Sequence, residues 1–507
     1  LEFLDDETDH LEIDLTKKVA LDDESFPRPA GPASAVHIFA ATLELAPARM
    51  TLRWEGIAPV HEEPAVPKLE IDLESQRAEE QRLTLRLETL DPYGSVSSTV
   101  EDVVLGSHEA VTLVKRLAQK VSGKFDLRVR LEGPGDGRFV EHRTSFACLP
   151  KDTRMATKDS PFGMWCFFEV HNGLPPESAG PLMRMAGVRW TLPGFLLSKG
   201  EEENAGRLAV LERNRIGLNC GNVCCIANTC CESPGDPEEM LRKMQRMPRM
   251  DSWMVFWETS LSSRHRGSFP PELLGGKPLE LTEAEQRHLG NCWQAGIGYS
   301  KLVRKQYPGA KLIFGNGFPA FIGAMIRRGY PKEYLDAFGL DFDLFTSMPE
   351  RQPGPLYAPF SGIYVLRALQ RMYGYDEFPL YLTEAIYAPV APGWLTERQQ
   401  ADYYVRTHLL ALASGVVFFG MCTSPYDPGD EYFYSHYGPI GLLHRPPELN
   451  PRESFCAYST MTRILDQASF SGMLQTGSGS VFALKFNRKR GGSVHVLWTV
   501  RGRRRVM

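Results

Sequence analysis

The chain has 507 residues, of which 43% are hydrophobic and 23% are charged, as is usual for a soluble globular protein. This length exceeds one ordinary hydrophobic core, so two or three domains are expected. The formal net charge of −5 gives no general attraction to nucleic acid. No apolar run reaches the roughly 18 residues that a membrane span needs. Nucleic-acid binding and membrane insertion are therefore not expected.

Residues 1–150 are predicted to form an all-β domain. Alternating polar and apolar segments recur between turn signals. They lie at 36–45, 50–54, 68–73, 82–87 and 125–131. The glycine-rich turn at 133–137 then leads into 139–149, and this last pair should form a hairpin that closes a β-sandwich. We find no catalytic constellation here and expect an accessory domain that packs on its neighbour or contacts a glycan.

From residue 159 to about 472, short apolar strands alternate with longer helical patterns, which is typical of a parallel sheet with crossover helices. Eight strands are predicted, at 162–168, 188–192, 218–227, 253–257, 311–314, 343–346, 380–383 and 416–421. The helices that follow them are expected at 176–186, 206–215, 237–245, 283–306, 320–327, 363–372, 397–413 and 452–468. Eight such units favour an α/β fold of the (β/α)8 TIM-barrel type over an open sheet.

Residues 475–507 return to a β pattern. Segments 481–486 and 494–500 flank the turn Arg490-Gly491-Gly492, which predicts a hairpin. Two strands do not form a domain alone, so this partial β-sandwich should pack on the barrel or join the N-terminal domain. The basic residues at 485–490 and 501–505 are interpreted as solvated strand edges and a chain end rather than as a polyanion site.

Both ends of the chain and the cysteines leave questions open. The sequence begins LEFLDDETDH, without an initiator Met or an apolar leader, which predicts a processed or trimmed product and leaves the compartment unknown. Whether the C-terminus is cut short is left open. Five of the ten cysteines lie within 220–231, without paired CxxC spacing or a nearby His. Buried thiols are favoured over a metal site there, and a disulfide stays possible.

Two glutamates stand at the ends of buried strands. Glu258 ends the apolar run in DSWMVFWETSL, and Glu384 follows the apolar run in PLYLTEAIYAP. A carboxylate is costly in such a position unless it is solvated or used. In a TIM barrel the functional residues lie at the C-terminal ends of the strands, so these two predict a paired-carboxylate active site. The alternative is a pair of ordinary rim carboxylates, each held by Arg or Lys.

The predicted barrel rim is rich in residues that bind sugars. Aromatic faces stack on pyranose rings, and carboxylates and amides bind hydroxyl groups, so we expect an oligosaccharide or polysaccharide ligand. The candidate substrate-binding residues are Trp165, Glu169, His171, Arg189, Trp190, Trp257, Asn316, Tyr387, Tyr426 and Asp427. Two carboxylates about 5 Å apart would act with retention of configuration, and a separation of about 6.5–9.5 Å would indicate inversion.

The strand order and the phrases SPFGMW, LMRMAGVRW, VFWETS and YLTEA resemble the clan A retaining glycoside hydrolases, most of all the β-xylosidase and α-L-iduronidase family and its relatives. The resemblance implies that Glu258 is the acid/base, that Glu384 is the nucleophile and that Arg189 supports Glu384. It also implies a reaction without metal or organic cofactor, and the glycan substrate slightly favours a secreted or periplasmic location. One departure is Trp257, which stands where the clan usually has Asn.

Two other hypotheses remain open. The missing Asn motivates a carbohydrate-binding protein that has lost catalysis. Alternatively, the long loop after the eighth strand would supply Asp427, Asp430 and His436 to a metal-dependent hydrolase. The sequence does not decide the sugar, the anomer, exo or endo action, or the oligomeric state.

Overall fold

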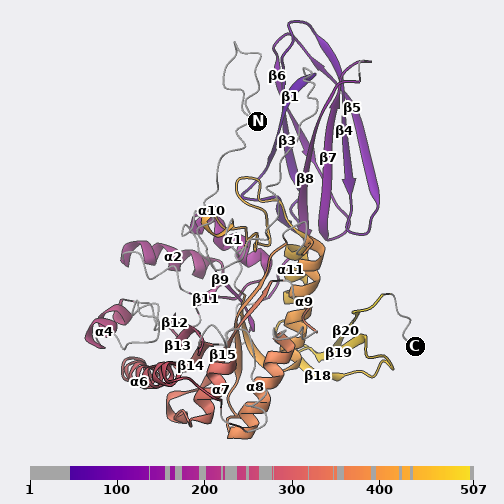
Figure 1. The fold of residues 1–507 in the computed structure, drawn as a ribbon. Coiled ribbons are helices and arrows are strands. Elements are labelled where there is room, and N and C mark those ends of the chain that lie inside the picture. Colours follow the sequence, from indigo (N-terminus) through magenta and orange to yellow (C-terminus); the bar gives the residue numbers. More distant parts are fainter. Residues whose placement is uncertain are drawn as a thin grey trace.

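The structure is a computed structural model, shown in Figure 1. It describes residues 46–135, 137–154, 160–165, 174–192, 201–218, 221–222, 237–246, 250–261, 277, 279–317, 319–345, 348–350, 359–389, 395–421, 425–433 and 438–502. Among these residues, no helix is both long enough and apolar enough to cross a membrane.

A curled parallel sheet forms the centre of the chain. Its strands pair in the order β11, β10, β9, β17, β16, β15, β14, β13, β12. They are β9 (Phe162–Trp165), β10 (Trp190–Leu192), β11 (Gly217–Leu218), β12 (Gly221–Asn222), β13 (Ser252–Thr259), β14 (Lys311–Gly317), β15 (Ala337–Phe345), β16 (Leu380–Tyr387) and β17 (Val416–Met421).

The two ends of this sheet lie close together. β11 and β12 are the outermost members of the order, yet only residues 219 and 220 separate them in sequence. Three Cα-to-Cα steps span at most about 11 Å, so the chain itself holds the two edges near each other. β11 and β12 are therefore two parts of the predicted third strand, and β17 pairs directly with β9. This confirms a TIM-barrel-like fold with eight parallel strands.

Helices follow the strands and cover the outside of the sheet (Figure 1). They are α1 (Pro176–Ala186), α2 (Glu201–Arg213), α4 (Pro237–Gln245), α6 (Glu283–Gln306), α7 (Pro319–Arg327), α8 (Pro359–Tyr373), α9 (Glu397–Ala413) and α11 (Glu453–Leu465), with the short η4 (Lys332–Tyr334) and α10 (Asp430–Phe433). Thr282 and Thr396 begin α6 and α9 with capping boxes, which satisfy backbone N–H groups at both helix starts. The predicted bounds of α1, α4, α6 and α9 are confirmed.

The prediction for the sixth strand was too short. β15 begins at Ala337 rather than at residue 343. Gly339 lies in its first half, and a Cβ at this position would come within 2.2 Å of the carbonyl oxygen of Gly315 on β14. A glycine usually indicates a turn, but here it permits the close approach of two strands.

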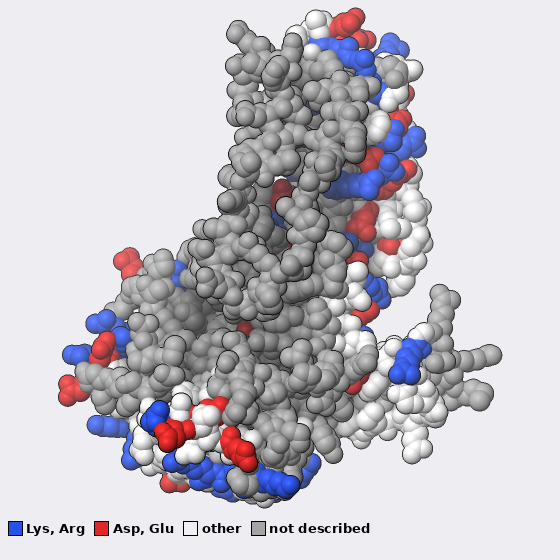
Figure 2. All heavy atoms as spheres, in the orientation of Figure 1, with Lys and Arg blue, Asp and Glu red and all other residues white. Residues whose placement is uncertain are grey.

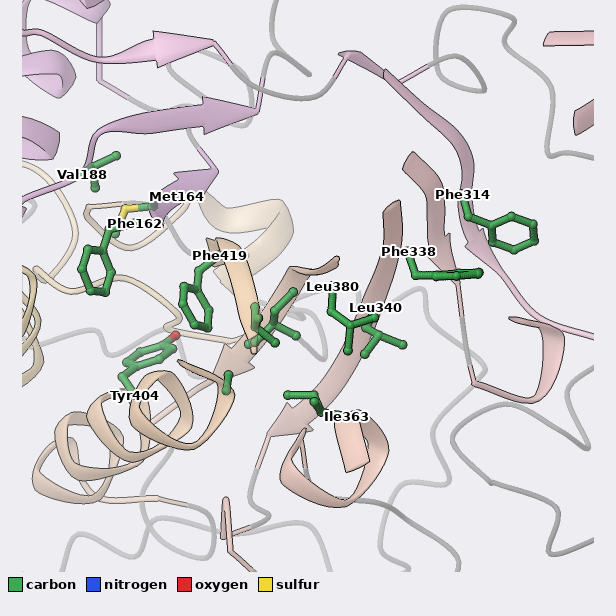
Figure 3. Close-up of a cluster of buried hydrophobic side chains, with 14 of the residues drawn as sticks. Phe162, Met164, Val188, Phe314, Phe338, Leu340, Ile363, Leu380, Tyr404 and Phe419 are labelled. Carbon is green, nitrogen blue, oxygen red and sulfur yellow. The ribbon is translucent and has the colours of Figure 1, made fainter. Parts of the chain in front are cut away.

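Apolar side chains occupy both sides of the sheet. The larger cluster lies between the sheet and the helices, and Figure 3 shows Phe162, Phe419 and Leu380 from the strands with Tyr404 from α9 and Ile363 from α8. A smaller cluster contains residues from the opposite face of the strands, toward the barrel interior. Its members are Trp165, Trp190, Met254, Ile313, Ala337, Tyr381, Ile386, Ala388, Phe418 and Ile440. These two clusters identify which side of a strand each residue faces.

The N-terminal region contains two sheets that share one buried cluster, which includes Ile71, Leu85 and Phe125. One sheet contains β1 (Ala48–Trp54), β3 (Lys68–Ser75) and β6 (Ala110–Arg116), and the other contains β2 (Val60–Glu62), β8 (Phe139–Leu149), β7 (Gly123–Glu132), β4 (Gln81–Leu90) and β5 (Val96–Leu105). The predicted pairing of the last two strands is confirmed. Residues 36–45, a further predicted strand, lie outside the described residues. β2, β5 and β6 were not predicted, and β5 and β6 expose most of their residues.

Opposite charges alternate over the N-terminal sheets. Figure 2 shows basic and acidic side chains intermingled there. Arg53 contacts Asp72 at 2.7 Å, and Arg128 contacts Glu141 at 2.6 Å. This mixture gives the described surface of these sheets no single sign of charge.

The C-terminal strands β18 (Ser469–Met473), β19 (Val481–Asn487) and β20 (Ser493–Thr499) form an antiparallel sheet. The predicted hairpin is confirmed, with β18 as a third strand that was not predicted. The indole Nε1 of Trp498 donates to Glu350 at 2.6 Å, and Glu350 also pairs with Arg406 on α9. Of the two predicted alternatives, the sheet therefore packs on the barrel.

Polar contacts join the N-terminal region to the barrel. Glu62 on β2 accepts from Arg184 on α1 and from Arg463 on α11, each at 3.1 Å. At the other end of α11, Lys124 on β7 lies 3.9 Å from Glu453, the first residue of the helix, and Thr144 on β8 donates to Asn450 just before it at 2.8 Å. The N-terminal sheets thus contact α11 at both of its ends.

Candidate active site

A β-bulge in β16 lies next to Glu384. Leu340 of β15 pairs with Leu382, and the next residue, Asp341, pairs with Glu384. Thr383 is therefore one extra residue on β16. Bulges of this kind re-aim the side chains that follow them and are common next to active sites.

The bulge decides which side of the sheet Glu384 faces. Before it, Tyr381 belongs to the inner cluster and Leu382 to the outer one; after it, Ile386 is inner and Tyr387 is outer. Side chains alternate along a strand with a period of two, so Glu384 lies on the same side as Ile386, toward the barrel interior. In a strand with regular alternation and no bulge, Glu384 would lie on the same side as Leu382, toward the helices.

Trp165 stabilises the backbone at this bulge. Its indole Nε1 donates to the carbonyl oxygen of Thr383 at 3.0 Å, and the Thr383 hydroxyl donates to the carbonyl oxygen of Leu340 at 2.8 Å. Glu384 is buried, with 3% of its surface exposed. The Trp165 side chain from β9 thus lies beside the peptide group that precedes Glu384.

Glu258 lies at a similar irregularity in β13. Trp257 pairs with Asn316 and Thr259 pairs with Gly317, so Glu258 is the extra residue between two consecutive pairs. The backbone of Glu258, Trp257 and Asn316 belongs to described strands, whereas their side chains lie outside the part that the structure describes. Both predicted catalytic glutamates therefore occur at bulges near the C-terminal ends of their strands.

The pairing register relates the two glutamates. Thr259 pairs with Gly317 on β14, which pairs with Leu340 on β15, which in turn pairs with Leu382 on β16. By this register, Glu384 lies about two positions beyond Glu258. Strands in a TIM barrel are inclined by about 36°, so residues at one height shift by about one position per strand. Three strand steps, about 14 Å along the sheet, separate β13 from β16. The shift over these steps brings the two backbone positions to about the same height.

Trp190 lies on the inner side of the barrel, as Trp165 does. Each tryptophan is 6% exposed. The Trp190 indole donates to the carbonyl oxygen of Ser160 at 2.9 Å, and its ring covers Gly217, where a Cβ would come within 2.4 Å of the ring. The sequence-predicted residues Trp165, Trp190 and Glu384 are thus brought to the interior of one barrel.

Arg189 has a different role from the one predicted. It precedes β10, and its guanidinium donates to Asp152 at 2.8 Å and to the Val188 carbonyl oxygen at 3.1 Å. Burial lowers the pKa of Arg189, and the neighbouring Arg154 lowers it further, while Asp152 opposes both effects. The expected role of Arg189 in supporting Glu384 is therefore corrected. The Arg189 guanidinium instead pairs with Asp152, in the segment that joins the N-terminal sheets to the barrel.

Tyr387 belongs to the core rather than to the rim. Its hydroxyl lies 2.8 Å from the Thr407 hydroxyl on α9, and its ring packs edge-on against Tyr404. Complete burial raises the pKa of Tyr387 well above its ordinary value. Tyr387 follows the bulge by three residues and so faces the helices, which corrects its prediction as a sugar contact.

Asp427 and Tyr426 hold the loop after β17. Both carboxylate oxygens of Asp427 accept from Arg452, at 2.7 and 2.6 Å, and one also accepts from the Gly441 N–H. The Tyr426 hydroxyl accepts from the Leu174 N–H at 2.8 Å. Both residues are buried, so their predicted roles as substrate ligands are corrected to structural ones.

These contacts also weaken the metal-dependent alternative. Asp427 is already occupied by Arg452, and Asp430 pairs with Arg445. Within the described residues, no group of three or more His, Cys, Asp or Glu side chains is placed to hold a metal ion.

Several predicted residues lie outside the described residues: Glu169, His171, His436 and the five cysteines of 220–231. The described cysteines Cys148, Cys292 and Cys456 are buried and form no disulfide with one another. The residues that sequence reasoning missed are Thr383 and Asp152. An extra residue in a bulge leaves no pattern in a strand this short, and Asp152 lies 37 residues from its partner Arg189.

No protein family model matches the chain, and no curated protein matches its sequence. Among solved structures, the chain is similar to Bacteroides uniformis beta-glucuronidase 2, with a TM-score of 0.41, 11% identity, and coverage of 90% of this chain and 58% of that one. It is also similar to a GH2 beta-galacturonidase from Eisenbergiella tayi, with a TM-score of 0.39, 13% identity, and coverage of 83% and 73%. A third is xylanase 10B from Thermotoga maritima, with a TM-score of 0.40, 13% identity, and coverage of 60% and 95%.

These neighbours are glycoside hydrolases, and the chain spans 58% of the length of the Bacteroides enzyme. At such identities and TM-scores the similarity assigns neither a family nor an activity. The resemblance to the β-xylosidase and α-L-iduronidase family is not confirmed. The function must therefore be argued from the residues of the barrel.

Proposed function

We propose that this protein is a retaining glycoside hydrolase in which Glu384 is the nucleophile and Glu258 is the acid/base. One observation carries the proposal: the bulge at Thr383 turns Glu384 toward the barrel interior, near the end of the seventh strand. A buried carboxylate in that position is where TIM-barrel enzymes hold catalytic groups. The side chain of Glu258, whose backbone lies at about the same height on β13, would be the second carboxylate that glycosidic cleavage needs.

The chemistry follows from these two groups. The Glu384 carboxylate attacks the anomeric carbon while the Glu258 carboxylic acid protonates the leaving oxygen, so one C–O bond forms as the glycosidic C–O bond breaks. Glu258 then removes a proton from water, and the resulting hydroxide displaces Glu384 from the sugar. Each of the two displacements inverts the anomeric carbon, so the configuration is retained after both.

The inner tryptophans support a sugar ligand. Trp165 and Trp190 come from the neighbouring strands β9 and β10, and both belong to the inner cluster. Each tryptophan is 6% exposed and its N–H group is already bonded to the backbone, so only apolar ring surface is left to contact a pyranose. We propose that they form part of the wall against which the sugar binds.

We also propose a division of labour along the chain. Residues 1–150 would form an accessory β-sandwich, residues 159–472 the catalytic barrel, and residues 475–507 part of a second β unit. Because the N-terminal sheets contact α11 at both of its ends, this accessory region would stabilise the barrel.

Aryl glycosides that differ in sugar and anomer would identify a substrate, and two substitutions then test the proposal. Glu384→Gln removes the nucleophile and should lower kcat by at least about 10⁴-fold. Glu258→Ala removes the acid and should lower kcat/KM by about 10²–10⁴-fold for a poor leaving group and far less for a nitrophenolate. Steady-state kinetics on paired substrates measure both effects.

Glu285→Gln is a matched control, because Glu285 is also buried but belongs to the capping box of α6. It should lower stability and leave kcat unchanged. Equal losses on good and poor leaving groups in the Glu258 variant would contradict its role as the acid. Binding of an oligosaccharide without any turnover by the unaltered protein would instead favour a carbohydrate-binding protein.

A further inference from the structure

A cavity of about 290 Å³ lies at the end of α11, apart from the candidate active site. Its lining residues come from the segment before β9, from the end of α11 and from the β19–β20 turn: Arg154, Arg463, Ile464, Asp466, Gln467, Arg488, Lys489 and Arg490. Arg154 precedes a barrel strand and Asp466 follows a barrel helix, so the cavity lies toward the N-terminal ends of the strands. Glu258 and Glu384 lie near the opposite ends.

Positive charge exceeds negative charge around this cavity. Among the described residues, the carboxylates that contact its arginines are Asp152, Asp466 and Glu62. The same three carboxylates also pair with Arg184 and Arg189, so they contact four guanidinium groups: Arg154, Arg184, Arg189 and Arg463. Arg488 and Arg490 add two more guanidinium groups to the lining of the cavity. These six guanidinium groups exceed the three carboxylates by three positive charges, even without counting Lys489.

One of the buried arginines has unused hydrogen-bonding capacity. The Arg463 side chain is 10% exposed, and its Nη2 donates to Glu62 at 3.1 Å. Within the described residues, no acceptor lies within hydrogen-bond distance of its buried Nε. Burial lowers the pKa of Arg463, which indicates that the surrounding carboxylates do not fully compensate its charge. An anion in the cavity would offset part of this positive charge.

We propose that this cavity binds a tetrahedral oxyanion, a sulfate or phosphate group that is either free or carried on a sugar. Guanidinium groups match such oxyanions because they donate two parallel hydrogen bonds. Arg154 and Arg463 form the fixed, buried side of the site, and Arg488 and Arg490 close it from the exposed hairpin turn. Asp466 is the one acid in the lining, and it is turned toward Arg154 at 3.8 Å. The volume, close to the lower bound of about 300 Å³ for ligand pockets, leaves room for a small carrier beside the anion.

The test uses the full chain and the double substitution Arg488→Ala/Arg490→Ala. Both side chains are exposed, and the turn itself depends on Gly491 and Gly492, which have positive φ values and stay unchanged. Calorimetric titration with inorganic phosphate, inorganic sulfate, glucose phosphate and glucose sulfate, at an ionic strength held constant with sodium chloride, should give saturable binding. The double variant should raise Kd by at least about tenfold. Arg49→Ala/Arg287→Ala, two exposed arginines elsewhere, should leave Kd unchanged.

The sugar-borne and inorganic anions identify the source of the group. Tighter binding of a sugar sulfate or sugar phosphate would support a carrier in the cavity, and equal affinities would support a site for the free ion. The absence of saturable binding by any of the four probes would overturn the proposal, as would an equal Kd in the Arg488/Arg490 variant. Hydrolytic activity plays no part in these readouts, so the result is independent of the proposed glycosidase reaction.

Discussion

The loop after β17 depends on one buried carboxylate. Asp427→Ala should destabilise the protein by about 3–5 kcal/mol, because it leaves the nearly buried guanidinium of Arg452 without its bidentate partner. Asp430→Ala in the same loop should cost less than about 1 kcal/mol, because Asp430 is 70% exposed. Chemical denaturation of both variants checks this. Equal losses of stability would show that Asp427 does not have the structural role assigned to it.

Glu397 gives the fold a dependence on acid pH. Burial raises the pKa of Glu397, but the hydrogen bond with His444 and the charge of Arg452, with a smaller effect of Lys124, outweigh it and lower the pKa from 4.5 to about 2. Because the pKa is lower in the folded state, the stabilisation is present above about pH 4.5 and is lost as the pH falls to about 2. Solvent screening limits it to about 1 kcal/mol.

Urea denaturation between about pH 7 and about pH 2 compares the protein with Glu397→Gln. The difference in unfolding free energy between the two should shrink as the pH falls below about 4.5. A difference that stays constant over the whole range would mean that Glu397 does not titrate in this way.

At the level of residues, the sequence singles out the two glutamates as candidates but does not reveal the partners of the other predicted site residues. A carboxylate in an apolar strand is visible in the sequence, so Glu384 could be singled out. The partners of Arg189 and Asp427 could not, because Asp152 and Arg452 lie 37 and 25 residues away. Nor does sequence reveal that Tyr387 faces the helices, since that depends on the extra residue at the bulge.

Among the elements, the contact between β14 and β15 gives the sharpest prediction. Gly339→Ala would force a Cβ to within 2.2 Å of the Gly315 carbonyl oxygen and should destabilise the protein by about 1–3 kcal/mol or more. The matched control is Gly206→Ala in α2, where no atom lies within 4 Å of the new Cβ. It should stabilise the protein by about 0.5–1 kcal/mol. Thermal denaturation measures both, and a neutral Gly339→Ala would contradict the close approach of these strands.

Strands and helices were otherwise predictable where periodicity and capping agree. The helices α6 and α9 begin at Thr-x-x-Glu and Thr-x-x-Gln sequences, and their bounds were predicted correctly. The strand β5 was missed because most of its residues are exposed, which removes the alternation that identifies a half-buried strand. Bulges escape prediction because one added residue changes the facing of later side chains without changing composition.

For the whole molecule, the count of eight βα units predicted the closed order of strands, and the pairing of β17 with β9 bears it out. How the N-terminal sheets attach was not predictable, since that contact joins residues far apart in the sequence, such as Glu62 with Arg463 across 401 residues, and also buries Val60 and Leu149 in the cluster of the barrel. The proposed reaction depends on this larger arrangement, because the two glutamates come from strands separated by β14 and β15.

The most direct test of the central claim is a crystal structure that gives the distance between the carboxyl groups of Glu258 and Glu384. The proposed retaining mechanism predicts a separation of about 5 Å across the barrel interior. A separation of about 6.5–9.5 Å would contradict retention and indicate inversion. If the two carboxyl groups face different sides of the sheet, they cannot act on one glycosidic bond, and the assignment of the active site is wrong.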